Sequence, residues 1–295
     1  MCAYSAIIRY FLFFMGLRDI LDKNGFRFQK RFGQNFISDG NLLRSIVDKA
    51  DLSDSDVVVE IGVGGATLTR ALSERVKKVI GFEIDKNLIP VIAESLSGVE
   101  NAEVVFKDFM KVDLQQLEKE IGENYCVVAN LPYYITTPII MRLVEESSLC
   151  KKIVVMVQKE VADRICAKPS TADYGSITVA VASVADAEIV ADVNRKMFYP
   201  QPNVDSAVVK IDINRSKYEI KSRSALRNAI KTAFSSRRKT LANNLINTLK
   251  ISRKTAEEIL KSANVDVGVR GETLSVEEFI RLADAISQSK DNGEN

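Results

Sequence analysis

An alternation of short apolar runs with amphipathic segments fills most of this 295-residue chain and restricts its fold more than any other feature. The apolar runs are typical of buried strands and lie at 56–62, 79–85, 102–108 and 125–131. Segments with helical spacing separate them at 42–52, 66–76 and 87–96. Apolar strands that alternate with helices indicate a parallel sheet covered on both faces. The sequence therefore predicts a doubly wound α/β domain with ligands beyond the carboxyl ends of its strands.

The pattern continues through the middle of the chain. A helix at 139–147 is expected before a strand and a helix within 153–165. Two further apolar segments, at 177–193 and 206–213, are predicted to supply later strands that close the sheet as an antiparallel pair. The α/β domain is thus expected over residues 18–213.

The charge pattern changes beyond residue 213. The segment from Arg215 to Ser262 contains thirteen Lys and Arg residues but only three Asp and Glu residues. Its net charge is therefore +10, in a chain whose total net charge is +2. The four segments with helical spacing here are ALRNAIKTAF, KTLANNLINTL, RKTAEEILKSA and VEEFIRLADAISQ. We expect a small, basic, all-α domain at 214–287, followed by a frayed tail at 288–295.

The absence of histidine excludes several kinds of chemistry at once. Ser-His-Asp hydrolysis, Cys-His proteolysis and His-ligated zinc sites, including those of zinc base deaminases, all need an imidazole. No pair of cysteines has CxxC spacing, so we expect reduced thiols in a cytosolic protein, and no metal, from Cys2, Cys126, Cys150 and Cys166.

The N-terminal extension, residues 1–17, has no assigned role. Its apolar part, 6–17, is too short to span a bilayer and is interrupted by Arg9, so no membrane partner is expected. Two interpretations stay open: an additional amphipathic helix, or residues that lie upstream of a true start at Met15.

A glycine-rich turn follows the first strand in EIGVGGATLT (60–69). Gly62 and Gly64 allow the backbone to turn sharply and to approach a ligand closely. Thr67 stands where a dinucleotide fingerprint has its third glycine, so the turn suits a ligand without a pyrophosphate. The alternative is a tight turn that binds nothing.

Polar side chains end the next three strands. Glu83 lies 21 residues after Gly62, where a carboxylate can accept hydrogen bonds from both ribose hydroxyls. Asp108 could accept a hydrogen bond from an adenine amino group, and Asn130 ends the fourth strand within YCVVANLPYYITTP (125–138). Any one of these could be a helix cap, but together they predict one nucleoside-binding crevice.

Seven motifs in this order resemble those of S-adenosylmethionine-dependent methyltransferases, and within them the KsgA/RsmA family of ribosomal RNA adenine dimethyltransferases. They are KRFGQNFISD (30–39), VVEIGVGGATLT (58–69), GFEIDKNL (81–88), VVFKDFM (104–110), ANLPYYITTPI (129–139), MFYPQPNVDSAV (197–208) and FSSRRKTLANNL (234–245). The resemblance covers roughly residues 20 to 285. It implies a Rossmann-like class I methyltransferase domain with a helical C-terminal domain.

The resemblance also implies the reaction: two adjacent adenines near the 3′ end of small-subunit rRNA are dimethylated at N6, in an immature 30S subunit, by a cytoplasmic monomer that uses S-adenosylmethionine. The Asn130 side-chain oxygen and the Leu131 carbonyl would accept the amino hydrogens, held by the fixed φ of Pro132. Tyr133 would stack on one face of the adenine and Phe198 on the other, although Phe198 is alternatively a core aromatic.

The same resemblance assigns two further groups of residues. Those expected at the cofactor are Gln34, Asn35, Ile37, Gly62, Gly64, Glu83, Ile84, Asp108, Phe109 and Asn130. Those expected to bind RNA phosphates are Arg237, Arg238, Lys239, Lys30 and Arg31, with a solvated helix face as the alternative for the first three.

Other functions compete with this assignment. The Erm family, which dimethylates large-subunit rRNA, shares the adenine pocket but usually has NIPY where this chain has Leu131. A DNA adenine methyltransferase would usually carry (N/D)PPY. A non-catalytic assembly or transcription factor would have no need for Gly62, Glu83 and Asp108 together with the NLPY motif.

Overall fold

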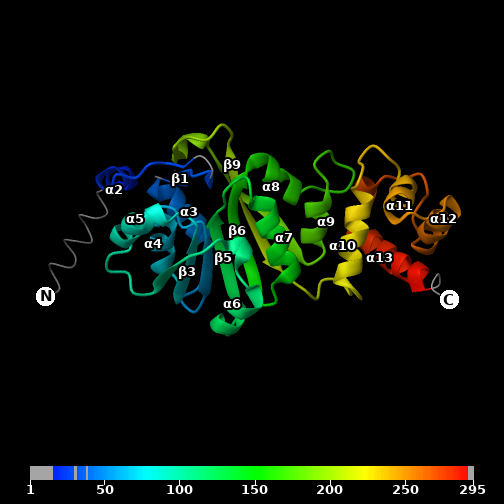
Figure 1. The fold of residues 1–295 in the computed structure, drawn as a ribbon, viewed down its shortest axis with the longest axis horizontal. Helices are drawn as coiled ribbons and strands as arrows, with labels where there is room; N and C mark the ends of the chain where they lie inside the picture. The colour runs from blue at the N-terminus through cyan, green and yellow to red at the C-terminus, as the bar shows by residue number, and fades with distance from the viewer. Residues whose placement is uncertain (1–15, 30–31, 38, 292–295) are drawn as a thin grey trace. The chain divides into compact units, whose positions relative to one another are not determined.

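A computed structural model gives the structure of residues 16–29, 32–37 and 39–291 (Figure 1). The chain divides into two compact units. The first contains the described residues up to Ile140 together with Glu146–Ala162 and Glu188–Ile211. The second contains Met141–Glu145, Asp163–Ala187 and the described residues from Asp212 onward. Because the second unit draws on three stretches of chain, the functional domain boundary at residue 213 stays a prediction.

A seven-stranded sheet has the order β4-β3-β2-β5-β6-β9-β7. Its strands are β2 (Val57–Ile61), β3 (Lys78–Glu83), β4 (Ala102–Phe106), β5 (Tyr125–Asn130), β6 (Cys150–Gln158), β7 (Ala185–Val193) and β9 (Ser206–Ile213). The pairs β2–β3, β3–β4, β2–β5 and β5–β6 are parallel. The chain reverses its direction of growth beside β2, which confirms the doubly wound α/β prediction and brings the ends of β2 to β5 to one edge.

Helices connect these strands in Figure 1. Their bounds are α2 (Leu17–Lys23), α3 (Gly40–Lys49), α4 (Thr67–Ser73), α5 (Ile89–Ser95), α6 (Leu114–Ile121), α7 (Thr136–Glu146) and α8 (Lys159–Ile165). Helix α6 was not predicted from the sequence. Asp113 begins it by accepting from the Gln116 amide, and Gly122, at φ +72°, ends it.

The centre of the sheet is fully apolar. All five residues of β2 are buried, and Val58 packs with Val79, Val128 and Val154 of neighbouring strands. Burying one such side chain contributes about 1.5–3 kcal/mol. This core fixes the strand register, and therefore the positions of the residues that follow each strand.

A separate two-stranded ladder joins distant parts of the first unit. Strand β1 (Phe36–Ile37) pairs antiparallel with β8 (Phe198–Tyr199), with Ile37 opposite Phe198. Short 3₁₀ turns occur at η2 (Lys86–Leu88), η3 (Phe109–Lys111), η4 (Arg195–Met197) and, in the second unit, η5 (Gly271–Thr273).

The second unit is mainly helical. It contains α9 (Ser176–Ala182), α10 (Arg223–Ala233), α11 (Leu241–Leu249), α12 (Arg253–Ser262) and α13 (Val276–Asp291), the last four coloured yellow to red in Figure 1. All four helices expected after residue 213 are therefore present. They enclose a core that includes Tyr174, whose hydroxyl donates to the Leu274 carbonyl at 2.7 Å.

One sequence prediction is wrong in this part of the chain. Residues 177–182, about the first third of the segment predicted to supply a strand, lie in helix α9, because a run that is buried on every side fits either structure and packing decides between them. Helix α13 extends to Asp291, and the frayed tail at 288–295 stays a prediction. None of the described helices is long and apolar enough to cross a membrane.

Candidate active site

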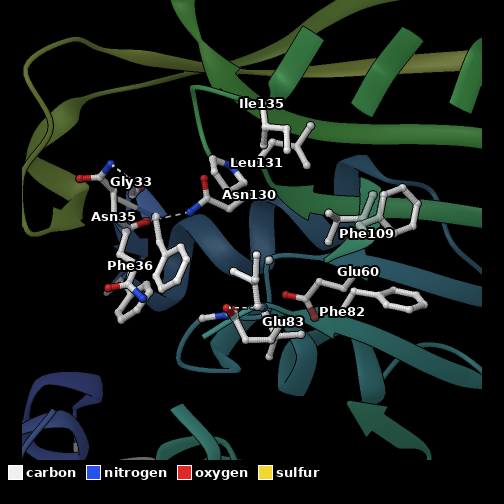
Figure 2. A pocket seen from close by; sticks show the side chains of 18 of the residues that line it. Gly33, Asn35, Phe36, Glu60, Phe82, Glu83, Phe109, Asn130, Leu131 and Ile135 are labelled. Atoms are coloured by element: carbon white, nitrogen blue, oxygen red, sulfur yellow. Dashed lines mark hydrogen bonds between the residues drawn. The ribbon is translucent and has the colours of Figure 1, made fainter. Parts of the chain in front are cut away.

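One pocket lies at the carboxyl ends of β2, β3, β4 and β5 (Figure 2). Every residue predicted for the cofactor or the target amino group lines it, with the exception of Phe198. These residues come from the glycine-rich turn, from three further strand ends and from segment 33–37, which precedes the sheet in sequence. Residues far apart in the chain thus meet at one place, as the parallel topology requires.

The glycine-rich turn forms the floor of this pocket. Gly62 and Gly64 have φ values of +81° and +56°, which favour glycine. A Cβ added to Gly64 would lie 2.9 Å from the Phe36 ring, so a side chain there would push segment 33–37 away. The Gly64 amide donates to Glu83 Oε2 at 2.8 Å, which ties the turn to the end of β3.

Glu83 is held ready to accept further hydrogen bonds. Its Oε1 accepts from the backbone amides of Ile84 and Asp85, both at 2.8 Å. Burial raises the pKa of this carboxyl, and the three backbone amides oppose that shift. Because each carboxylate oxygen can accept two hydrogen bonds, Oε2 keeps one acceptor position in the pocket.

Glu60, at the end of β2, was not predicted as a site residue. It is 1% exposed, and Figure 2 shows its carboxyl between Glu83 and Phe109. Among the described residues its Oε2 has no hydrogen-bond partner, and burial, with the charge of Glu83 adding to it, raises its pKa to about 8. The available signal was its position as the first residue of the glycine-rich segment EIGVGGATLT (60–69).

The Asn130 side chain has a fixed orientation. Its Nδ2 donates to the Asn35 carbonyl oxygen at 2.8 Å, the contact drawn as a dashed line in Figure 2. Among the described residues none donates to Oδ1. The amide oxygen is therefore available as an acceptor, and the amide cannot flip without losing its bond to Asn35.

The loop after Asn130 is held at several points. The Leu131 amide donates to the Met156 carbonyl at 3.2 Å, and the Pro132 carbonyl accepts from the Ile135 amide at 3.1 Å. The Tyr133 hydroxyl lies 2.7 Å from Ser206 Oγ. Burial raises the pKa of Tyr133, so its hydroxyl stays protonated at neutral pH. The ring of Tyr134 is 59% exposed.

Apolar side chains form the wall beside Glu83. Phe109 packs edge-on against Phe82 with ring centroids 5.4 Å apart, and Ile84 is 43% exposed. Asp108 precedes them and accepts from the Met110 amide at 3.0 Å, so it also caps the short turn η3. The pocket thus offers a flat apolar surface next to carboxylates at two strand ends.

Segment 33–37 covers one side of the pocket. The Gln34 Nε2 donates to Asp85 Oδ2 at 2.8 Å, while its Oε1 accepts from the Gln29 amide at 2.9 Å. The Ile37 carbonyl accepts from Thr67 Oγ1 at 3.4 Å. The predicted contacts of Gln34, Asn35 and Ile37 with a cofactor stay predictions.

Phe198 lies in the hydrophobic core and does not line the pocket. It is 4% exposed and packs in the cluster that contains Ile37, Leu42 and Val208. Of the two alternatives given for Phe198 from the sequence, this placement agrees with the core aromatic. Its predicted stacking on adenine would require the ring to leave that core.

The predicted RNA-binding residues differ in their surroundings. Arg237 donates to the carbonyls of Ala172 and Tyr174 and lies 3.7 Å from Glu272. Arg238 and Lys239 have exposed side chains. Lys30 and Arg31 lie outside the described residues.

The residues of the pocket fit an amino-acid-bearing nucleoside. Glu83 offers an acceptor for a ribose diol, Ile84 offers a surface for a base, and the turn at Gly62 and Gly64 leaves room for a close approach. The Glu60 Oε2, which has no hydrogen-bond partner among the described residues, can accept a hydrogen bond from a cationic group. Among the described residues no cluster of His, Cys, Asp or Glu is arranged to hold a metal ion.

Comparison with known proteins identifies the family. A family model described as "Ribosomal RNA adenine dimethylase" matches residues 25–288. This chain belongs to that family. Among similar dimethylase sequences, "Ribosomal RNA small subunit methyltransferase A" of Clostridioides difficile (strain 630) is 45% identical over 273 residues, which cover 92% of this chain and 94% of that protein. The protein of the same name from Bacillus licheniformis is 44% identical over 278 residues, with coverages of 92% and 95%.

Solved structures of dimethylases support the assignment. A dimethyladenosine transferase from Plasmodium falciparum superposes with a TM-score of 0.73 and 26% identity, over 86% of this chain and 98% of that one. The 23S rRNA methyltransferase ErmE gives a TM-score of 0.64 and 28% identity, over 86% and 100%. The predicted fold class and family are thus confirmed, and the chain has the class I methyltransferase fold.

Proposed function

We propose that this dimethylase transfers methyl groups from S-adenosylmethionine to N6 of two adjacent adenines near the 3′ end of 16S rRNA. It acts as a monomer, in the cytoplasm, on an immature 30S subunit. The observation that carries the proposal is the Asn130 amide, fixed by Asn35 with its oxygen free in the pocket that contains Glu83. The names of relatives at 44–45% identity favour small-subunit over large-subunit rRNA.

The cofactor would be held by the strand ends. Glu83 would accept from its ribose hydroxyls and Asp108 from its adenine amino group, with Ile84 and Phe109 against the adenine ring. The turn at Gly62 and Gly64 would approach its amino-acid part. When bound, S-adenosylmethionine supplies a methyl group on a sulfonium, which is an electrophile with a neutral leaving group.

The protein's own task is to prepare a weak nucleophile. The lone pair of the adenine amino nitrogen is delocalised into the ring, so the planar amino group attacks poorly. Two acceptors on its hydrogens, Asn130 Oδ1 and the Leu131 carbonyl, favour a pyramidal nitrogen with its lone pair directed away from the ring. Pro132 restricts the loop, and the Tyr133 ring, anchored at Ser206, would stack on the base.

No strong base is needed for this step. The amino proton is lost after the transfer, to water, because the methylated nitrogen is then positively charged and acidic. The absence of histidine from the chain fits that sequence of events. Arg238 and Lys239 would bind phosphates of the RNA and supply a salt-dependent part of the affinity.

Methyl transfer from labelled S-adenosylmethionine to immature 30S subunits tests the proposal. Naked large-subunit RNA is the parallel substrate, and the label is mapped to the modified nucleotide. We expect N6,N6-dimethyladenine in the small-subunit RNA. Label in the large-subunit RNA alone would indicate an Erm-type enzyme. Bound cofactor without transfer to either substrate would indicate a non-catalytic assembly factor.

A further inference from the structure

A buried carboxylate outside the proposed catalytic set holds segment 33–36 in place. Asp85 is 2% exposed and lies two residues after Glu83. Its Oδ2 accepts from Gln34 Nε2 at 2.8 Å, and Gln29 Nε2 lies 3.3 Å from both carboxylate oxygens. Its Oδ1 also accepts from the Asn87 amide at 3.1 Å, so Asp85 begins η2 as well. The group is therefore fully used by the protein and has little capacity left for a ligand.

The bond from Asp85 to Gln34 continues toward the other half of the pocket. Gln34 is followed by Asn35, whose carbonyl accepts from Asn130 Nδ2 at 2.8 Å. Phe36 comes next and packs against Gly64. Segment 33–36 is thus attached to the end of β3 by Gln34 and to the end of β5 by Asn35.

This connection determines which way the Asn130 amide faces. An asparagine amide can rotate by half a turn with little change of shape, which would exchange its donor and acceptor. Only the Asn35 carbonyl distinguishes the two orientations among the described contacts of this side chain. A shift of segment 33–36 would remove that selection and allow the NH₂ group to face the adenine amino group, donor against donor.

We propose that Asp85 is a positioning residue for methyl transfer, acting through Gln34 and the Asn35 carbonyl to keep the Asn130 oxygen directed at the target amino group. The inference rests on the proposed role of Asn130. It assigns to Asp85, which lies two residues beyond the end of β3, a task in orienting the methyl acceptor at the end of β5.

An exchange of donor and acceptor tests the connection. Asp85→Asn places an amide NH₂ against the Gln34 NH₂, because the Asn87 backbone amide and Nδ2 both donate to Oδ1 and keep the remaining oxygen on that side. Gln34→Glu places two carboxylates side by side. We expect each single variant to lower kcat on 30S substrate by about ten- to a hundredfold, because small misplacements near the reacting atoms act mainly on the chemical step. For Asp85→Asn, which is not in the set expected at the cofactor, the cofactor Kd should change less than about threefold.

The double variant, Asp85→Asn with Gln34→Glu, restores the hydrogen bond with its direction reversed. We expect kcat to recover to within about threefold of the native enzyme, as coupled neighbours show non-additive effects. Gln116→Glu, the same chemical change on an exposed helix α6 side chain, is the matched control and is expected to leave kcat unchanged. A double variant no faster than the slower single variant overturns the proposal.

A second measurement keeps this inference separate from the proposed function. The NMR signal of the Asn130 side-chain NH₂ group can be assigned by its loss in Asn130→Ala. The rate at which its hydrogens exchange with solvent reports on the hydrogen bond to the Asn35 carbonyl. We expect faster exchange in both single variants and native exchange in the double variant. Identical exchange in all of them overturns the role of Asp85, even if Asn130→Ala abolishes transfer. Full transfer by Asn130→Ala overturns the role of Asn130 and therefore the proposed function.

Discussion

Arg237 should respond to substitution differently from its neighbours Arg238 and Lys239. The guanidinium of Arg237 already donates to two carbonyls of the second unit and lies near Glu272. The exposed side chains of Arg238 and Lys239 are available to phosphate. We therefore expect Arg238→Ala/Lys239→Ala to weaken RNA binding, and Arg237→Ala to act mainly on stability.

The magnitude follows from counterion release. Each phosphate contact contributes roughly 0.7–0.9 to the slope of log K against log salt concentration, so losing two contacts lowers the slope by about 1.4–1.8. Between about 50 and 200 mM salt, the affinity of the native protein should then fall about tenfold more than that of the double variant. Arg237→Ala should leave the slope unchanged and cost about 1 kcal/mol of unfolding free energy, because its partners are only partly buried.

Fluorescence anisotropy with a labelled rRNA fragment at four or more salt concentrations measures these slopes. Urea unfolding of the same proteins measures the stability. An unchanged slope in the double variant would show that these side chains, which lie in the turn between α10 and α11, are solvated and bind no phosphate. A slope that falls only in Arg237→Ala would show that the internal bonds of Arg237 open when RNA binds.

Three further predictions concern single side chains. Asn130→Ala should lower kcat by on the order of 10²-fold or more and change cofactor affinity only a few-fold, as measured by transfer assays and calorimetry; parallel loss of both would contradict its role at the amino group. Glu118→Ala should cost about 2–6 kcal/mol of unfolding free energy, measured in urea, because the amides of Ser148 and Leu149 lose a buried acceptor. Glu118→Gln should cost less, and neither variant should alter methyl transfer. The raised pKa of Glu60 means that the folded state binds the proton more tightly than the unfolded state does. The stability of the ligand-free protein should therefore fall as the pH rises from about 4.5 to 8. Thermal melts at several pH values measure this fall, which Glu60→Gln should flatten.

Much of the site was predictable because, in a parallel sheet, the residues that end neighbouring strands lie at the same edge. Glu83, Asp108 and Asn130 each follow an apolar run, and residues that follow parallel strands meet at one edge. The apolar runs themselves are clear, since both faces of these strands are buried. The family motifs then supplied hypotheses for what each strand end does.

Side-chain partnerships could not be predicted in the same way. The bond between Asn35 and Asn130 joins residues 95 positions apart, and nothing in the local sequence distinguishes an exposed Arg238 from an internally bonded Arg237. Phe198 was assigned to the pocket because its motif resembles one at the target base, whereas its burial depends on how β8 pairs with β1. Helix α9 was missed because its β-branched residues favour a strand, whereas packing in the core of the second unit places them in a helix.

The second unit is built from three separate stretches of chain, which limits where the protein can be cut to give a fragment that folds. Tyr174 and Val179 belong to the same core as α10 to α13, and the Tyr174 hydroxyl bonds to the Leu274 carbonyl. A fragment that starts at residue 214 would carry the four helices but leave a hole where these side chains belong. During synthesis, Leu274 is added 100 residues after Tyr174, so the core of this unit cannot be completed before the segment around Leu274 has been synthesised.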